Sequence, residues 1–148
     1  MEVDEIKLII RSIFDPIARK IGLEGPYEEV HSNFSFSFGY FSNDVGIEVR
    51  VDMSDFFIYL LLFKTRQKKI PIGYKDHTGH RQKLYFQEAL KELSLGGETE
   101  TKELQRLGGD FRNCEKMASL LANLLKEKWS LVVSQKTKLF SDFLDGKA

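Results

Sequence analysis

Cysteine, proline and net charge are all scarce in this sequence, and each scarcity excludes a class of protein. Cys114 is the only cysteine, so the chain cannot close an internal disulfide or a zinc site of several cysteines. Three prolines and no low-complexity tract argue against a disordered linker. The 22 basic and 22 acidic side chains cancel, so the overall positive excess typical of nucleic-acid binders is missing. We therefore expect an intracellular, cytoplasmic globular protein.

Long apolar runs are missing as well. The longest, residues 56–63, is far shorter than the ~20 residues that span a bilayer. The first residues, MEVDEIK, are acidic rather than basic, so we expect no secretory signal and no membrane partner. The hydrophobic share of 42% fits one ordered domain over residues 1–148, and twelve phenylalanines predict an aromatic-rich core.

The periodicity of the apolar residues predicts an α+β fold. In residues 2–21 they recur every three or four positions, which predicts an N-terminal helix, kinked or restarted at Pro16. The next forty residues change to a period of two, and with a shorter strand after them they predict a four-stranded antiparallel meander. Its strands are expected at about 29–41, 45–52, 55–64 and 68–72. The run 56–63 is apolar on both faces and must be covered on both.

Helical periodicity returns in the last part of the chain. It predicts two or three helices, at about 81–94, 99–107 and 110–144, packed on the sheet. A continuous helix over 110–144 would be ~51 Å long, more than the ~40 Å diameter of a globule of this size. We therefore expect a break between residues 128 and 134, or an end that packs on a second subunit. The second alternative predicts a homodimer.

The zero net charge hides an uneven distribution. Residues 1–63 contain 5 basic and 11 acidic side chains, residues 64–83 contain 7 and 1, and residues 84–148 contain 10 of each. A concentrated patch of one sign can steer a charged partner whatever the total charge, although cations are also common in a solvated loop. The candidate partner-binding residues are Lys64, Arg66, Lys68, Lys69, Tyr74, Lys75, Arg81 and Lys83.

The same window contains the best candidate for metal or acid–base chemistry. Asp76, His77 and His80 are residue types that bind zinc. Their spacing lacks the two helical histidines and the glutamate of HExxH, so a solvated loop that caps a following helix is the simpler interpretation. We expect no metal and no cofactor.

Other candidate sites have a simpler structural interpretation. Cys114 lies on an apolar helical stripe, where a free cysteine behaves as a small buried hydrophobe. The alternating aromatics of NFSFSFGYF do not match an RNA-binding RNP1 motif and are expected in the core. Glu48, Arg50 and Asp52 share one strand face and could line a cleft, but a solvated outer face is the expectation. The glycines form no P-loop, dinucleotide fingerprint or GxSxG elbow.

Without a catalytic constellation, the leading hypothesis is a non-catalytic protein-binding domain. It would be immunity-, adaptor- or chaperone-like and use the sheet or the basic 64–83 segment to bind a protein partner, acidic if the cations make the contact. Nucleic-acid binding through the same segment is the alternative, with cations on phosphates and Tyr74 or Tyr85 stacking on a base. A metal-dependent enzyme at the Asp76, His77 and His80 loop is third.

Overall fold

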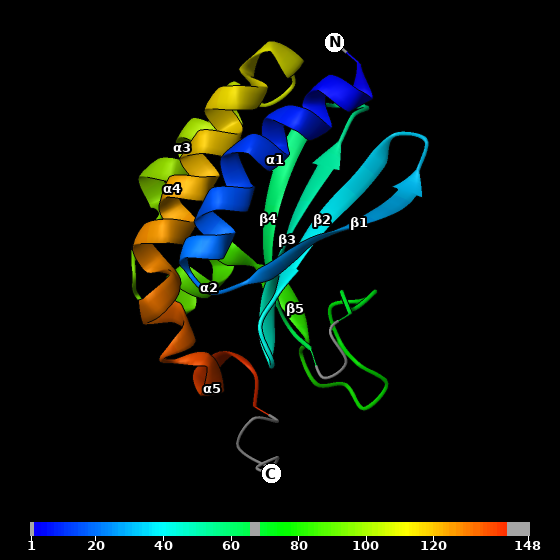
Figure 1. Ribbon diagram of the computed structural model, residues 1–148. Helices are drawn as coiled ribbons and strands as arrows, with labels where there is room; N and C mark the ends of the chain where they lie inside the picture. Colours follow the sequence, from blue (N-terminus) through cyan, green and yellow to red (C-terminus); the bar gives the residue numbers. More distant parts are fainter. Residues whose placement is uncertain (1, 66–68, 142–148) are drawn as a thin grey trace.

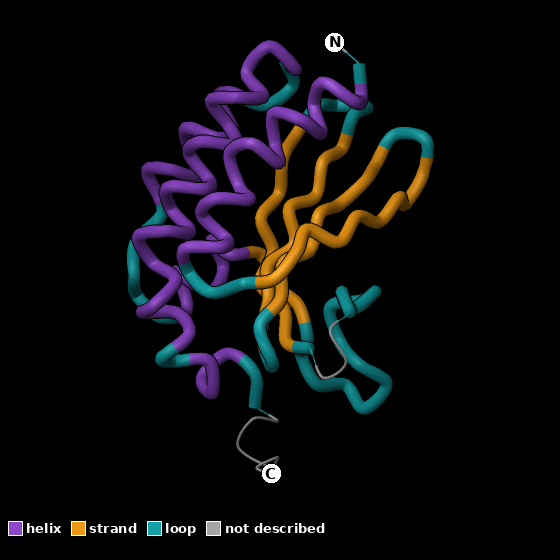
Figure 2. Tube along the Cα trace, viewed as in Figure 1, coloured by secondary structure: helices purple, strands orange, loops and turns teal. Residues whose placement is uncertain are grey.

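The protein is an α+β structure with a layer of helices on one face of a five-stranded antiparallel sheet. The computed structural model describes residues 2–65 and 69–141. The sheet is a simple meander in the order β1-β2-β3-β4-β5, so each strand pairs with its neighbour in sequence. Figures 1 and 2 show the helices on one side of the sheet and the loop between β4 and β5 on the other. The strands are β1 (Glu24–Ser32), β2 (Ser35–Phe41), β3 (Val45–Asp52), β4 (Phe57–Lys64) and β5 (Lys83–Tyr85).

The helices cover what we call the inner face of the sheet. α1 (Val3–Lys20) precedes the sheet, and its buried residues include Ile6, Ile10 and Phe14. After the sheet come α2 (Phe86–Glu92), α3 (Glu98–Leu107), a short 3-10 turn η1 (Phe111–Asn113), α4 (Cys114–Val133) and α5 (Lys136–Leu139). α1 and α4 lie side by side on the strands (Figure 1). None of the helices among the described residues is long and apolar enough to cross a membrane.

Strand alternation explains why the inner face is apolar. In β3 the side chains of Val45, Ile47, Val49 and Val51 belong to the core between sheet and helices. The intervening residues point to the opposite side, which we call the outer face, because successive strand side chains alternate. Phe36, Phe38 and Tyr40 of β2 are also in the core, which confirms that these aromatics are core residues.

The expected strand 29–41 is two strands. β1 and β2 form a hairpin that turns at Asn33 and Phe34, and Phe34 is 61% exposed instead of buried. The sequence hides this turn because Phe34 continues the alternation of Phe36 and Phe38. This split adds one strand, and β5 stands in place of the fourth expected strand, so the sheet has five strands instead of four.

The other corrections fall on the segment between β4 and α2. Of the expected strand 68–72, the described residues 69–72 are not in a strand. The helix expected from Arg81 begins at Phe86, because Lys83–Tyr85 pairs with β4 as β5. The helix expected over 110–144 ends at Val133 and a separate turn of helix follows, so the chain takes the predicted break. α1 runs on through Pro16 without a break.

Part of the outer face is covered by the chain itself. Ile70 forms a second apolar cluster with Phe41 and Phe63, and these two rings are 5.4 Å apart. Glycines make the room: a Cβ on Gly39 would lie 2.5 Å from Ile70, and one on Gly46 would lie 2.7 Å from the Phe63 ring. At one end of β4, which is apolar on both faces, the outer face is therefore covered by Ile70 of the following loop.

The packing at Gly46 gives a first prediction. A methyl group there would also lie 2.4 Å from the backbone oxygen of Tyr40, which cannot move without disturbing the sheet. Gly46→Ala should therefore lower the free energy of unfolding by about 1–3 kcal/mol. Gly73→Ala is the matched control, since its nearest contact would be 3.5 Å away. Urea denaturation of both variants measures the difference, and equal stabilities would contradict the packing described here.

Candidate functional site

The outer face carries a buried carboxylate that none of the described helices covers. Glu48 of β3 has no exposed surface. Lys83 of β5, itself 2% exposed, places its Nζ 2.7 Å from Glu48 Oε1. The second oxygen, Oε2, accepts hydrogen bonds from Ser37 Oγ at 2.5 Å and from Arg50 Nε at 3.1 Å. A buried charge needs such partners because burial without them is strongly unfavourable.

His31 of β1 extends this network toward solvent. Its Nε2 lies 2.7 Å from Ser37 Oγ and 3.6 Å from Glu48 Oε2. Ser37 has one hydroxyl proton, and that proton is donated to Glu48. His31 Nε2 must therefore carry a hydrogen and donate it to Ser37. The result is a chain of donors that ends on the carboxylate.

This arrangement does not suit nucleophilic catalysis. In a serine triad the hydroxyl donates to the imidazole, which in turn is oriented by the carboxylate. Here the hydroxyl of Ser37 donates to the carboxylate and accepts from the imidazole, and Ser37 is fully buried. The three side chains are arranged to hold Glu48 rather than to activate Ser37.

Glu48 is held as the charged carboxylate. Burial by itself raises the pKa of a carboxyl group, but Lys83 acts in the other direction through its charge and its hydrogen bond. The hydrogen bond from Ser37 and the charge of Arg50 add to the effect of Lys83. The balance leaves the pKa of Glu48 below its ordinary value.

A row of aromatic rings lies beside the network on the same face. Ring centroids are 4.8 Å apart for Phe57 and Tyr59, 5.7 Å for Tyr59 and Tyr85, and 6.1 Å for Tyr85 and Tyr74. The register places Tyr59 directly opposite Arg50. The Tyr74 hydroxyl donates to Tyr85, and this bond together with burial raises the pKa of Tyr85 to about 12. Tyr85 is therefore uncharged at neutral pH.

The structure separates the described residues of the predicted basic binding segment. Lys64 is buried with its Nζ 3.8 Å from Asp76, Arg81 pairs with Glu92 at 2.8 Å, and Lys83 pairs with Glu48. Lys69, Tyr74 and Lys75 are exposed. Arg66 and Lys68 lie outside the described residues. A single basic surface over residues 64–83 is therefore not supported, because three of its cations have carboxylate partners.

The Asp76, His77 and His80 loop folds around its own carboxylate. Asp76 Oδ1 accepts hydrogen bonds from the backbone of Thr78 and His80 and from the Thr78 hydroxyl. The hydroxyl bond contributes most to lowering the pKa of Asp76 to about 2. The loop leads into β5 and not into a helix, so the expected helix cap is wrong. Among the residues that the structure describes, no three His, Cys, Asp or Glu side chains are placed to share a metal ion.

Cys114 lies in the core at the first residue of α4. Burial raises the pKa of its thiol to about 11, so little thiolate exists at neutral pH. The side chain behaves as the small hydrophobe that the sequence indicates.

The residues that sequence reasoning misjudged are those of the Glu48 network. Glu48 and Arg50 were expected on a solvated face, and that expectation is wrong for Glu48, which is fully buried. The alternation of β3 does place both on the outer face, but their partners Ser37 and Lys83 come from β2 and β5. Only the strand register brings these four residues together.

Comparison with protein-family models, curated proteins and solved structures finds no match to this chain. The geometry of the outer face is therefore the feature of the molecule that bears on its function. That face combines a buried charge network, a held arginine and a row of aromatic rings.

The network predicts a large effect of removing Glu48. Glu48→Ala leaves the Lys83 ammonium buried without its partner and should lower the free energy of unfolding by about 3–5 kcal/mol. The double variant Glu48→Leu with Lys83→Met removes both charges, and we expect it to recover most of that loss. Denaturant unfolding of the wild type, the single variant and the double variant provides the comparison. A double variant as unstable as the single one would show that Lys83 is not paired as described.

The lowered pKa of Glu48 also predicts a pH dependence. A carboxyl group whose pKa is lower in the folded state contributes stability above its ordinary pKa of 4.5, and this contribution is lost as the pH falls through the folded value. In Glu48→Gln that contribution is absent. The stability difference between the wild type and Glu48→Gln should therefore be constant above about pH 5.5 and shrink below about pH 4.5. Curves that stay parallel down to about pH 3 would contradict the assignment.

Proposed function

We propose that the protein is a non-catalytic protein-binding domain that uses the outer face of its sheet. The observation that carries this proposal is the row of Phe57, Tyr59, Tyr85 and Tyr74 beside an arginine that is held in place by Glu48. Tyrosine and arginine are the residue types enriched, with tryptophan, among the residues that dominate binding energy at protein interfaces. Aromatic rings with a polar end suit a surface that is solvated when free and buried when bound.

The fixed position of Arg50 supports this assignment. Its Nε donates a hydrogen bond to Glu48 Oε2 at 3.1 Å, its Nη2 lies 3.0 Å from the same oxygen as an ion pair, and its side chain keeps 28% of its surface exposed. A guanidinium has five N–H donors, so those that do not face Glu48 remain for a partner. Because the side chain is already ordered, less conformational entropy is lost on binding than for a free surface arginine.

The charges around Arg50 favour a protein over a nucleic acid as the partner. The same row of the outer face carries Glu29, opposite Ser37, and the next row carries Asp52, opposite Phe57. Carboxylates on both sides of a single arginine repel phosphate. A protein partner can place both cations and carboxylates against such a mixed surface.

The proposal predicts a partner that depends on the aromatic row. In affinity capture from cells of the source organism, the wild type should retain a protein that the double variant Tyr59→Ser with Tyr85→Ser does not. With the purified partner, calorimetry should show at least a ~30-fold weaker affinity for the variant, about 2 kcal/mol. Leu131→Ser is the control, because Leu131 is exposed on α4, away from the sheet.

Two results would contradict the proposal. One is capture that is equal for the wild type and the aromatic variant when both are folded by denaturant unfolding. The other is binding of generic RNA or DNA that weakens steeply with salt and is lost in the same variant, since that pattern identifies phosphate contacts.

A further inference from the structure

The loop between β4 and β5 presents an unusually exposed apolar side chain. Ile72 is 99% exposed, and it sits between Ile70, which is buried against the sheet, and Tyr74. Isolated exposed apolar residues are common, but the loop that presents Ile72 is held in place by hydrogen bonds. The side-chain amide of Gln82 donates to the backbone oxygens of Gly73, at 2.8 Å, and Lys75, at 3.3 Å.

Two cations flank this side chain. Lys69 and Lys75 are exposed, and neither forms an ion pair with any residue in ranges 2–65 and 69–141. The described part of the loop therefore offers one apolar tip with a positive charge on each side along the chain. A complementary surface would be a hollow with an apolar floor and carboxylates at its rim.

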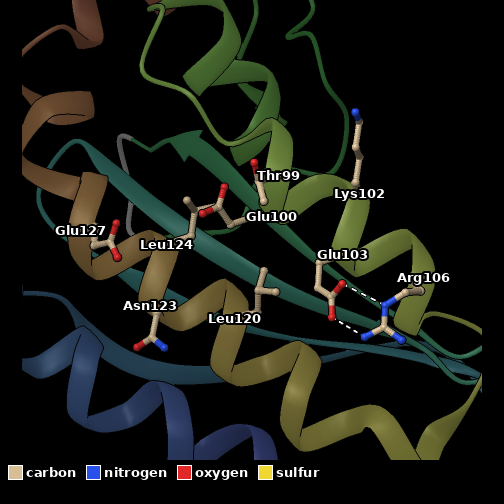
Figure 3. Close-up of a pocket in the computed structure, with 9 residues that line it drawn as sticks. All are labelled: Thr99, Glu100, Lys102, Glu103, Arg106, Leu120, Asn123, Leu124 and Glu127. Atoms are coloured by element: carbon tan, nitrogen blue, oxygen red, sulfur yellow. Dashed lines mark hydrogen bonds and ion pairs between the residues drawn. The ribbon is translucent and has the colours of Figure 1, made fainter.

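The helical layer of the same chain has such a hollow. A groove of about 590 Å³ lies between α3 and α4, and Leu120 and Leu124 form its floor. Glu100 and Glu127 stand at the rim beside Leu124 (Figure 3). Two cations also line the groove: Arg106 is paired with Glu103 farther along it, and Lys102 extends away from Glu100 and Glu127. Within the described chain no cation pairs with Glu100 or Glu127. The volume is within the range of 300–1,000 Å³ typical of pockets that hold a ligand.

The groove and the loop cannot meet within one molecule. The loop lies on the outer side of the sheet, whereas α3 and α4 lie on the inner side, and the groove opens away from the strands (Figures 1 and 3). We infer that the chain associates head to tail, with Ile72 of one copy in the α3–α4 groove of the next and Lys69 and Lys75 against Glu100 and Glu127. Two different surfaces then meet at each contact, so the assembly grows into rings or open chains rather than stopping at a dimer.

A single loop in a groove is a small contact, below the ~1,200 Å² of a standard interface, so the association is weak. Sedimentation velocity of the full chain from roughly 10 µM to 1 mM should show an average mass that rises with concentration. Ile72→Asp should abolish the rise without changing the fold, because the side chain is fully exposed. Leu8→Asp is the control: Leu8 is 70% exposed on α1, outside both surfaces, and the rise should persist.

Charge exchange tests the pairing itself. The variant Lys69→Glu with Lys75→Glu and the variant Glu100→Lys with Glu127→Lys should each remain monomeric, because each places like charges across the contact. An equal mixture of the two should associate again, since every contact in it brings opposite charges together. Added salt should weaken this association, as expected of exposed ion pairs.

Three outcomes would overturn the inference. The first is a wild type that stays monomeric at the highest concentration. The second is an association that Ile72→Asp leaves intact. The third is a mixture of the charge-reversed variants that remains monomeric although both are folded. None of these variants changes an outer-face residue on which the proposed function depends. The association experiment can therefore fail while that proposal stands.

Discussion

The ion pair between Glu48 and Lys83 is the interaction on which the arrangement of the outer face depends. It joins β3 to β5 across β4, and both residues are almost without exposed surface. Buried ion pairs add little net stability, but they penalise alternatives strongly. β5 has only three residues, and a shift of one residue would turn Lys83 to the inner face among aliphatic side chains. The pair therefore fixes the register of β5, and with it the end of the preceding loop and the position of Tyr85.

The sequence predicted those elements whose pattern is repeated over several residues. The alternation of residues 45–52 predicted both ends of β3 correctly. The helical spacing of residues 2–21 predicted both ends of α1 to within one residue. Where the pattern was short or misleading, prediction failed. Phe34 continued the alternation into a turn, and the two isoleucines around Pro71 resembled a strand although the described residues there form a loop.

The candidate site was far less predictable than the fold. The density of positive charge predicted a binding segment at residues 64–83. Whether a cation there is free to bind a partner depends on carboxylates elsewhere in the chain. Lys83 and Glu48 are 35 positions apart, and Arg81 and Glu92 are on different elements. The apolar loop tip and the groove between α3 and α4 could not be predicted either. The exposure of Ile72 follows from the bracing by Gln82 and not from any local motif, and the groove is formed by residues of two helices.

The hydrogen-bond order in the His31 branch has a consequence for what the outer face offers a partner. Because the Nε2 hydrogen of His31 is committed to Ser37, the other ring nitrogen, Nδ1, is a hydrogen-bond acceptor in that tautomer. The outer face therefore combines an oriented acceptor at His31 with the oriented donors of Arg50. A molecule that fits this face has to supply a donor and an acceptor in matching positions.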